Sequence, residues 1–178
     1  MKKTGIAVCG LNGSGKTTLA KYLASLLSTD ENFRALDIED YYFRKSEQPY
    51  TNPRTRVEAL MLLQADVEQN PRFVLSAVSC DLGFAVTSRL ALVILLYAPR
   101  EIRSERIRRR SLERFGGRVL PGGDMYERER EFINFAAGRP DSDAERGLER
   151  LDCKLLRLDG TRPTAELAAD IAKIYREL

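Results

Sequence analysis

The residues best suited to chemistry lie near the start of the chain, in the stretch GLNGSGKTT at positions 10–18. This stretch fits the pattern G-x-x-x-x-G-K-[ST], in which glycines let several backbone N–H groups turn toward one phosphate. We expect Lys16 to reach the β- and γ-phosphates of a nucleotide, and the hydroxyl of Thr17 to bind Mg²⁺. The residues expected around the phosphates are Gly10, Asn12, Gly13, Ser14, Gly15, Lys16, Thr17 and Thr18.

Three carboxylates follow the second apolar run of the chain, in the stretch ALDIEDYY at positions 35–42. Parallel α/β sheets bind ligands at the carboxyl ends of their strands, so Asp37, Glu39 and Asp40 are expected beside the phosphates. Such carboxylates accept the proton of an attacking hydroxyl or hold the water shell of a metal ion. We favour Asp37 for the metal and Glu39 or Asp40 for the phosphate acceptor, and we expect at least one of the three to cap a helix or a turn.

Several classes of chemistry are disfavoured by the composition. The chain has no histidine, which removes Ser-His and Cys-His nucleophilic mechanisms. Its three cysteines, Cys9, Cys80 and Cys153, lack C-x-x-C spacing, which argues against a disulfide framework and a thiolate metal site. We therefore expect a cytoplasmic protein that relies on carboxylates, lysine, arginine and bound metal.

The net charge, the chain length and the absence of certain motifs limit the possible binding partners and protein classes. The net charge of +3, from 29 basic and 26 acidic residues, favours neither a nucleic acid nor a membrane surface as partner. The run at 90–98 is about half as long as a membrane-spanning helix. The D-x-x-G and N-K-x-D motifs of a GTPase are absent. A length of 178 residues also counts against AAA-type machines and helicases, so a small kinase remains.

The elements that must position these residues alternate along the chain. Helical patterns separate Val-, Leu- and Ile-rich runs that suit a parallel sheet covered on both faces. The pattern predicts one doubly wound α/β domain over residues 1–178, with a five-stranded parallel sheet and helices on both faces. The strands are expected at 4–9, 34–38, 73–78, 91–97 and 154–158, and helices at 16–27, 57–69, 99–115 and 163–178. We expect an acceptor-side excursion at about 41–70 and a lid at about 111–138.

Over nearly its whole length the chain resembles the nucleoside monophosphate kinase and shikimate kinase branch of the P-loop kinases. Arg106 and Arg110 match the R-x-x-x-R pair on the helix that enters the lid of adenylate kinases. The stretch at 117–119 (GRV) is similar to part of that lid. The stretch at 139–143 (RPDSD), followed by Arg150, is similar to the segment by which the chain leaves the lid, with its second acid displaced by one position.

This resemblance implies roles for further residues. Arginines at these positions neutralise the transferring phosphoryl group, and the candidates here are Arg106, Arg118, Arg139 and Arg150. The guanidinium of Arg110 would flank the adenine. The stretch DGTRP at 159–163, with Gly160 and Thr161, resembles the family's adenine loop. An ordinary turn would fit that stretch equally well.

The acceptor side departs from adenylate kinase. That family follows its third strand with D-G-F-P-R, whose arginine grips the monophosphate, whereas residues 76–83 here read SAVSCDLG. Arg54, Arg56 and Arg89 are candidate substitutes, and Asp81 is a candidate metal-side carboxylate. The other arginines near the lid are expected to be solvated; they are Arg103, Arg108, Arg109 and Arg114.

Together these features predict an ATP- and Mg²⁺-dependent kinase, monomeric or homodimeric, that phosphorylates a small molecule. A nucleotide or nucleoside is the first choice of acceptor, followed by a small hydroxylated metabolite. Two other classes stay open, a polynucleotide 5′-kinase and a regulatory module that binds a nucleotide without transferring phosphate. The first would need a basic groove with stacking aromatics, and residues 100–118 hold only Phe115.

Overall fold

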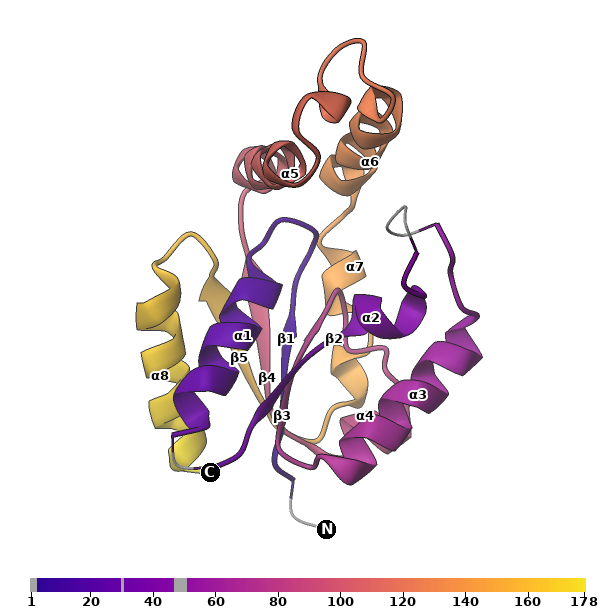
Figure 1. Cartoon of the computed structure of the whole chain (residues 1–178). Coiled ribbons are helices and arrows are strands. Elements are labelled where there is room, and N and C mark those ends of the chain that lie inside the picture. The colour runs from indigo at the N-terminus through magenta and orange to yellow at the C-terminus, as the bar shows by residue number, and fades with distance from the viewer. Residues whose placement is uncertain (1–2, 30, 47–50) are drawn as a thin grey trace.

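A single parallel sheet organises the protein. In the computed structural model, which describes residues 3–29, 31–46 and 51–178, five strands pair in the order β2-β3-β1-β4-β5 (Figure 1). The strands are β1 (Gly5–Cys9), β2 (Arg34–Asp37), β3 (Phe73–Ala77), β4 (Leu90–Tyr97) and β5 (Lys154–Asp159). Every neighbouring pair is parallel, so the carboxyl ends of all five strands meet at one edge. The predicted doubly wound, five-stranded α/β fold is confirmed.

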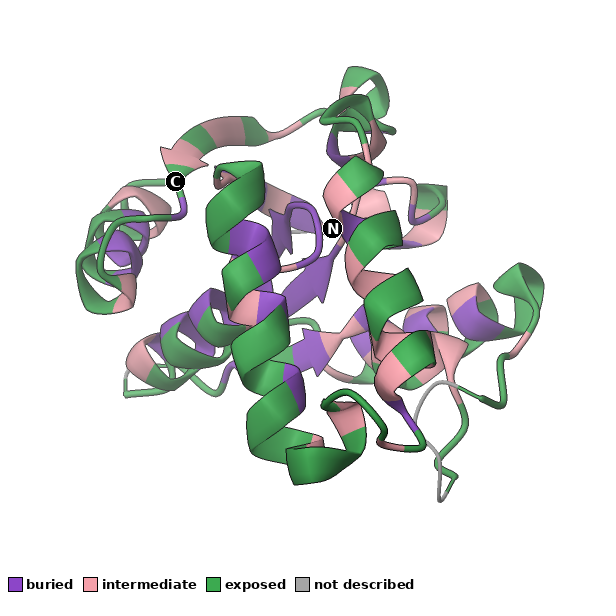
Figure 2. Ribbon diagram, turned by 90° about the horizontal axis from the view of Figure 1, so that it is seen from above, coloured by how far each residue is buried: buried purple, intermediate pink, exposed green. Residues whose placement is uncertain are grey.

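Helices cover both faces of the sheet. The longer ones are α1 (Lys16–Leu27), α3 (Arg56–Gln69) and α8 (Thr164–Arg176), and the shorter ones are α2 (Ile38–Tyr42), α4 (Phe84–Thr87), α7 (Ser142–Glu145) and η2 (Leu148–Arg150). Within β1, Ile6 and Val8 pack with α1 and α8, whereas Ala7 and Cys9 pack with α3 and α4. Both faces of the strand are therefore buried, which explains why the run lacks polar alternation. Figure 2 shows this burial, with buried residues in the strands and on the inward sides of the helices.

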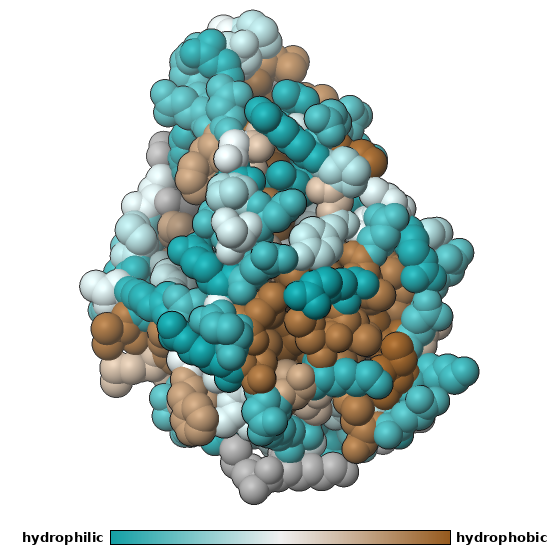
Figure 3. Space-filling view, turned by 180° about the vertical axis from the view of Figure 1, so that it is seen from behind, coloured by the Kyte–Doolittle hydropathy of each residue, from teal (hydrophilic) through white to brown (hydrophobic). Residues whose placement is uncertain are grey.

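The two faces differ in how well they are covered. On the face opposite α1 and α8, the helices α4 and α7 have only four residues each and η2 has three. An apolar area is visible at the surface on this side of the molecule (Figure 3). Half-buried residues that pack against the core there include Tyr97, Leu148, Leu151 and Leu155.

Residues 100–138 form an arm that stands beyond the carboxyl edge of the sheet (Figure 1). The arm consists of α5 (Arg100–Phe115), the short 3-10 helix η1 (Gly116–Val119) and α6 (Tyr126–Gly138). The sequence predicts α5 within one residue, but it gave no expectation of the helix α6. The polar repeat EREREF at the start of α6 has too little apolar periodicity to identify it.

Local signals explain most element boundaries. Thr55 caps α3 by accepting from the backbone N–H of Glu58, whose side chain accepts from the backbone N–H of Thr55. The strand expected to reach residue 38 ends at Asp37, because that side chain accepts from the backbone N–H of Glu39 and starts α2. Part of the acceptor-side excursion, residues 47–50, lies outside the described residues. Within the described ranges, no helix is long and apolar enough to cross a membrane.

Candidate active site

The glycine loop joins β1 to α1 at the carboxyl edge of the sheet. Gly13 and Gly15 have φ angles of +81° and +99°, which side-chain-bearing residues rarely adopt. A Cβ on Gly10 would lie 2.6 Å from the carbonyl oxygen of Leu96. The hydroxyl of Ser14 is buried and has no hydrogen-bond partner among the described residues. A tight loop with an unpaired buried hydroxyl fits a site that receives phosphate oxygens.

Lys16 supplies a buried positive charge at the base of this loop. The residue is only 6% exposed, and burial lowers the pKa of its amino group. The carboxylates of Glu39 and Asp37 raise that pKa, whereas Arg110 and Arg139 lower it further. Four other charged side chains predicted for the site therefore lie close enough to influence Lys16.

The side chains expected to hold a metal do meet. The hydroxyl of Thr17 donates to Asp37 Oδ2 at 3.0 Å and lies 3.3 Å from the hydroxyl of Ser76. Mg²⁺ prefers oxygen ligands and often takes only one or two from carboxylates, with phosphates and waters completing its shell. The three oxygens fit such an ion, and within the described ranges no cluster of three or more His, Cys, Asp or Glu residues offers another metal site.

Ser76 is a site residue that sequence reasoning did not identify. It lies in β3 between apolar neighbours, in the strand FVLSA, and is fully buried. A buried serine among such residues is the signal that could have identified it. Asp81, considered for the metal side, lies elsewhere and forms an ion pair of 3.0 Å with Arg56.

Three cavities adjoin the loop. The turn cavity, about 380 Å³, is lined by the loop and by residues of the 160–164 turn. The threonine cavity, about 760 Å³, is lined by Thr17, Asp37 and Ser76 together with Asp40. The aromatic cavity, about 520 Å³, is lined by Asn12 of the loop and by four aromatic side chains, those of Tyr42, Phe43, Phe115 and Phe132.

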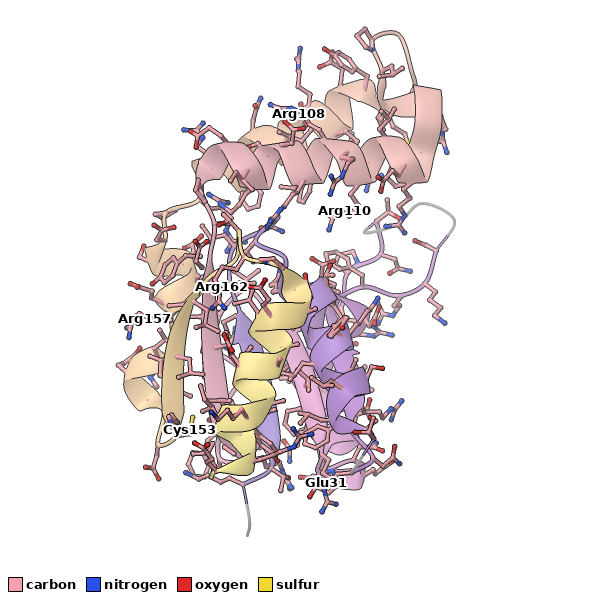
Figure 4. All side chains as sticks on the ribbon, turned by 90° about the vertical axis from the view of Figure 1, so that its left-hand side faces the viewer. Glu31, Arg108, Arg110, Cys153, Arg157 and Arg162 are labelled. Atoms are coloured by element: carbon pink, nitrogen blue, oxygen red, sulfur yellow. The ribbon has the colours of Figure 1, made fainter. Side chains whose placement is uncertain are left out.

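Several residues line more than one of these cavities, among them Arg110 and Glu39. Arg110 lines all three cavities, and Glu39 lines the threonine and aromatic cavities. Arg110 extends from α5 toward the sheet, whereas Arg108 lies on the opposite side of the helix (Figure 4). Of the two acids considered for the acceptor, Glu39 borders the aromatic cavity and Asp40 borders only the threonine cavity.

Arg106 holds backbone carbonyls together. Its Nη1 donates to the carbonyl of Ser14 at 3.0 Å, and its Nη2 donates to the carbonyl of Gly160 at 3.0 Å. A Cβ on Gly160 would lie 2.7 Å from the Ser14 carbonyl, so the two segments pack closely. Thr161 stabilises the turn by donating its N–H and hydroxyl to Asp159, which lowers the pKa of Asp159. In this structure Arg106 therefore binds main-chain carbonyls of the loop and the turn, and its role toward a phosphoryl group stays a prediction.

Arg139 and Asn12 connect the end of the arm to the loop. Arg139 Nη1 donates to Asn12 Oδ1 at 3.1 Å, and its Nε donates to Asp143 at 2.8 Å. The second bond lowers the pKa of the Asp143 carboxyl group. Arg139 is thus at the loop, and its role toward the phosphoryl group stays a prediction.

Arg118 and Arg150 do not reach the loop. Arg118 binds both oxygens of Asp124 at the outer end of the arm, with distances of 2.9 and 2.7 Å, and both side chains are exposed. Arg150 is 77% exposed and pairs with its neighbour Glu149. It precedes β5 at the amino edge of the sheet, where Asp152 pairs with Lys3 before β1. The expectation that Arg118 and Arg150 lie beside the transferring phosphoryl group therefore does not hold in this structure.

Arg103 is buried, so the expectation that it is solvated is wrong. The residue is 4% exposed and donates to the carbonyls of Ala98 at 3.2 Å, Ala136 at 3.1 Å and Asn12 at 3.4 Å. Burial lowers the pKa of its guanidinium. Positions 103, 106, 107 and 110 share one helical face, a spacing that could have identified it. Arg108 and Arg109 are exposed, as expected.

The chain is similar to a known protein family and to a protein of another organism. The family described as AAA domain matches residues 6–131, although the length of 178 residues counts against an AAA-type machine. The uncharacterized protein YqaC of Bacillus subtilis (strain 168) is 34% identical over 137 residues, which are 77% of this chain and 72% of that protein.

Three solved structures share the fold. A gluconokinase from Sinorhizobium meliloti 1021 has a TM-score of 0.59 at 16% identity, covering 98% of this chain and 95% of that one. An uncharacterized protein from Eubacterium ventriosum ATCC 27560 has a TM-score of 0.54 at 13% identity, covering 99% and 100%. A sugar kinase from Janibacter sp. HTCC2649 has a TM-score of 0.52 at 15% identity, covering 96% and 93%.

Proposed function

The chain belongs to the AAA domain family of P-loop proteins, and from this premise we propose that it is a small-molecule kinase that uses ATP and Mg²⁺. The observation that carries the proposal is that three cavities lie next to one another beside the loop, because Arg110 borders all three. A protein that only binds a nucleotide needs room for its base and phosphates. A further cavity next to the phosphate end supports an acceptor that receives the phosphoryl group.

The residues of the site then take separate roles in the proposed reaction. Lys16 would contact the β- and γ-phosphates, and Thr17 and Asp37 would hold the metal. When bound, Mg²⁺ neutralises charge on the phosphate oxygens. The acceptor oxygen bonds to the γ-phosphorus, the bond from that phosphorus to the β–γ bridging oxygen breaks, and Glu39 accepts the acceptor's proton. Arg139 stabilises the negative charge of the moving group.

Two kinds of acceptor fit this proposal. The resemblance in the lid favours a nucleotide or nucleoside. Two of the solved structures with this fold are described as a gluconokinase and a sugar kinase, which supports a small hydroxylated metabolite as the second candidate.

A phosphoryl-transfer screen tests the proposal directly. ATP labelled in its γ-phosphate is incubated with Mg²⁺ and with monophosphates, nucleosides, sugars, sugar acids and a 5′-hydroxyl oligonucleotide. We expect label in at least one small molecule and a loss of about 100-fold or more in turnover for Lys16→Ala. Lys173→Ala, an exposed lysine of α8, is the matched control. Transfer to the oligonucleotide alone, or ATP binding without any transfer, would support one of the other two classes instead.

A further inference from the structure

The aromatic cavity carries an excess of positive charge. Its described lining contains six arginines and three carboxylates; these are Arg56, Arg110, Arg114, Arg128, Arg139 and Arg146, with Glu39, Asp81 and Glu129. Asp143, which pairs with Arg139 and Arg146, neutralises one more charge. Among these described side chains, two positive charges exceed the carboxylates. Such a lining attracts an anion and gives a neutral sugar little advantage.

Two of these arginines flank the segment that follows β3. Arg56, at the start of α3, donates through Nη2 to the carbonyl and the carboxylate of Asp81, each at 3.0 Å. On the other side, the carbonyl of Arg146 accepts from the N–H of Cys80 at 3.1 Å. The neighbouring Gly147 has a φ of +86°, and a Cβ there would lie 2.6 Å from the carbonyl carbon of Cys80. The backbone that carries Arg146 is therefore fixed close against this segment.

Both guanidinium groups keep donors for a ligand. A guanidinium carries five N–H donors. Among the described residues, Arg56 contacts Asp81 through Nη2, and Arg146 contacts Asp143 through Nε and Nη2. Both side chains are about half exposed and line the aromatic cavity. Arginine at such a position binds carboxylate or phosphate oxygens with good geometry.

The other candidate arginines are placed differently. Arg54 donates to the carbonyl of Tyr41 at 2.9 Å and is not part of the cavity lining. Arg89 precedes β4, at the amino edge of the sheet, and pairs with Glu68. Residues 73–83, which contain β3 and the segment after it, contribute no lysine or arginine of their own.

We propose that the acceptor carries a compact anionic group, a phosphate or a carboxylate, bound by Arg56 and Arg146 in the aromatic cavity. The body of the acceptor packs against the rings of Tyr42, Phe43 and Phe132, which leaves its hydroxyl directed toward Glu39 and the loop. Phe132 belongs to the arm, so the arm forms part of the wall around the acceptor. This inference rests on the proposed kinase function, because only a kinase has a phosphate acceptor. Binding of the anion itself is measurable without any phosphoryl transfer.

Paired ligands that differ in one acidic group test the inference. Calorimetry measures the binding of uridine 5′-monophosphate against uridine, and of gluconate against glucose, to the full chain with and without a non-hydrolysable ATP analogue and Mg²⁺. We expect the anionic member of at least one pair to bind about tenfold or more tightly than its neutral partner. The pair that responds distinguishes a phosphate from a carboxylate.

Variants identify the binding residues. Arg56→Ala and Arg146→Ala are each expected to weaken binding of the anionic ligand about tenfold or more, leaving binding of the ATP analogue unchanged. Arg72→Ala is the matched control, since Arg72 is also half exposed and forms an ion pair, with Glu31, at 2.8 Å. Equal or absent binding of both members in each pair, or no effect of either variant, would overturn the inference. Anion binding without phosphoryl transfer would support it and would refute the proposed kinase activity alone.

Discussion

Replacing Arg103 tests whether one buried guanidinium holds the arm to the rest of the protein. The side chain donates to carbonyls in three segments, at the end of β4, in the glycine loop and in α6. In Arg103→Ala these carbonyls lose their charged partner and a cavity opens between the segments. Arg103→Lys keeps the charge but cannot reach three carbonyls with one planar group.

The expected loss of stability follows from these contacts. A hydrogen bond from a charged donor contributes about 1.5–3 kcal/mol, so the two bonds at 3.1 and 3.2 Å represent about 3–6 kcal/mol. Removing a charge that burial disfavours returns part of this energy. We therefore expect the free energy of unfolding to fall by about 2–4 kcal/mol, which lowers the melting temperature of a chain this size by about 4–16 °C.

Two measurements check this expectation. Urea denaturation gives the free energy of unfolding, and limited trypsin digestion reports whether the arm has become easier to cleave. Arg108→Ala is the matched control, because Arg108 is an exposed arginine of the same helix; its change should stay within about 0.5 kcal/mol. If Arg103→Ala behaves like this control in both measurements, the buried guanidinium does not hold the arm and the reasoning fails.

Three other variants probe the loop and its surroundings. Asp37→Asn keeps the cap on the Glu39 N–H but removes charge from the metal side, so the Mg²⁺ concentration for half-maximal transfer should rise about tenfold; an unchanged Mg²⁺ requirement would contradict this. Arg106→Ala should weaken ATP binding about tenfold, because its carbonyl contacts fix the loop against the turn; loss of turnover alone would favour the phosphoryl role instead. For Asp143, the bond from Arg139 lowers the folded-state pKa, so its stabilising contribution is present above the ordinary carboxyl pKa and is lost as pH falls through the lowered value. The stability difference between wild type and Asp143→Asn should therefore be constant near pH 7 and shrink below about pH 4, which urea denaturation at several pH values measures.

The sequence was sufficient to predict the core of the fold. Buried parallel strands must be apolar on both faces, so the runs rich in Val, Leu and Ile identified all five strands to within a residue or two. The glycine loop was equally clear, because its spacing describes a local backbone conformation. Thr17 and Asp37 could also be paired in advance, since the loop and the end of β2 lie at the same edge of a parallel sheet.

The arginines were harder to place because their roles depend on distant partners. Arg103 and Arg108 are identical in type and lie on different faces of one helix, and the face of Arg103 is buried because it packs against the loop and α6. Arg150 is different, because parallel topology alone could have excluded it. A residue just before a parallel strand lies at the amino edge, whereas the glycine loop lies at the carboxyl edge.

Arg103 and Arg139 both donate hydrogen bonds to Asn12, so a rigid movement of the arm would turn about this residue. One arginine lies near the start of α5 and the other just after α6, so both ends of the arm contact the same residue of the glycine loop. The 12 residues of α5 that follow Arg103 extend about 18 Å beyond this contact. A rotation of about 10° at Asn12 would therefore displace the far end of α5 by about 3 Å, so a small adjustment of the loop around a phosphate would produce a larger movement next to Arg118.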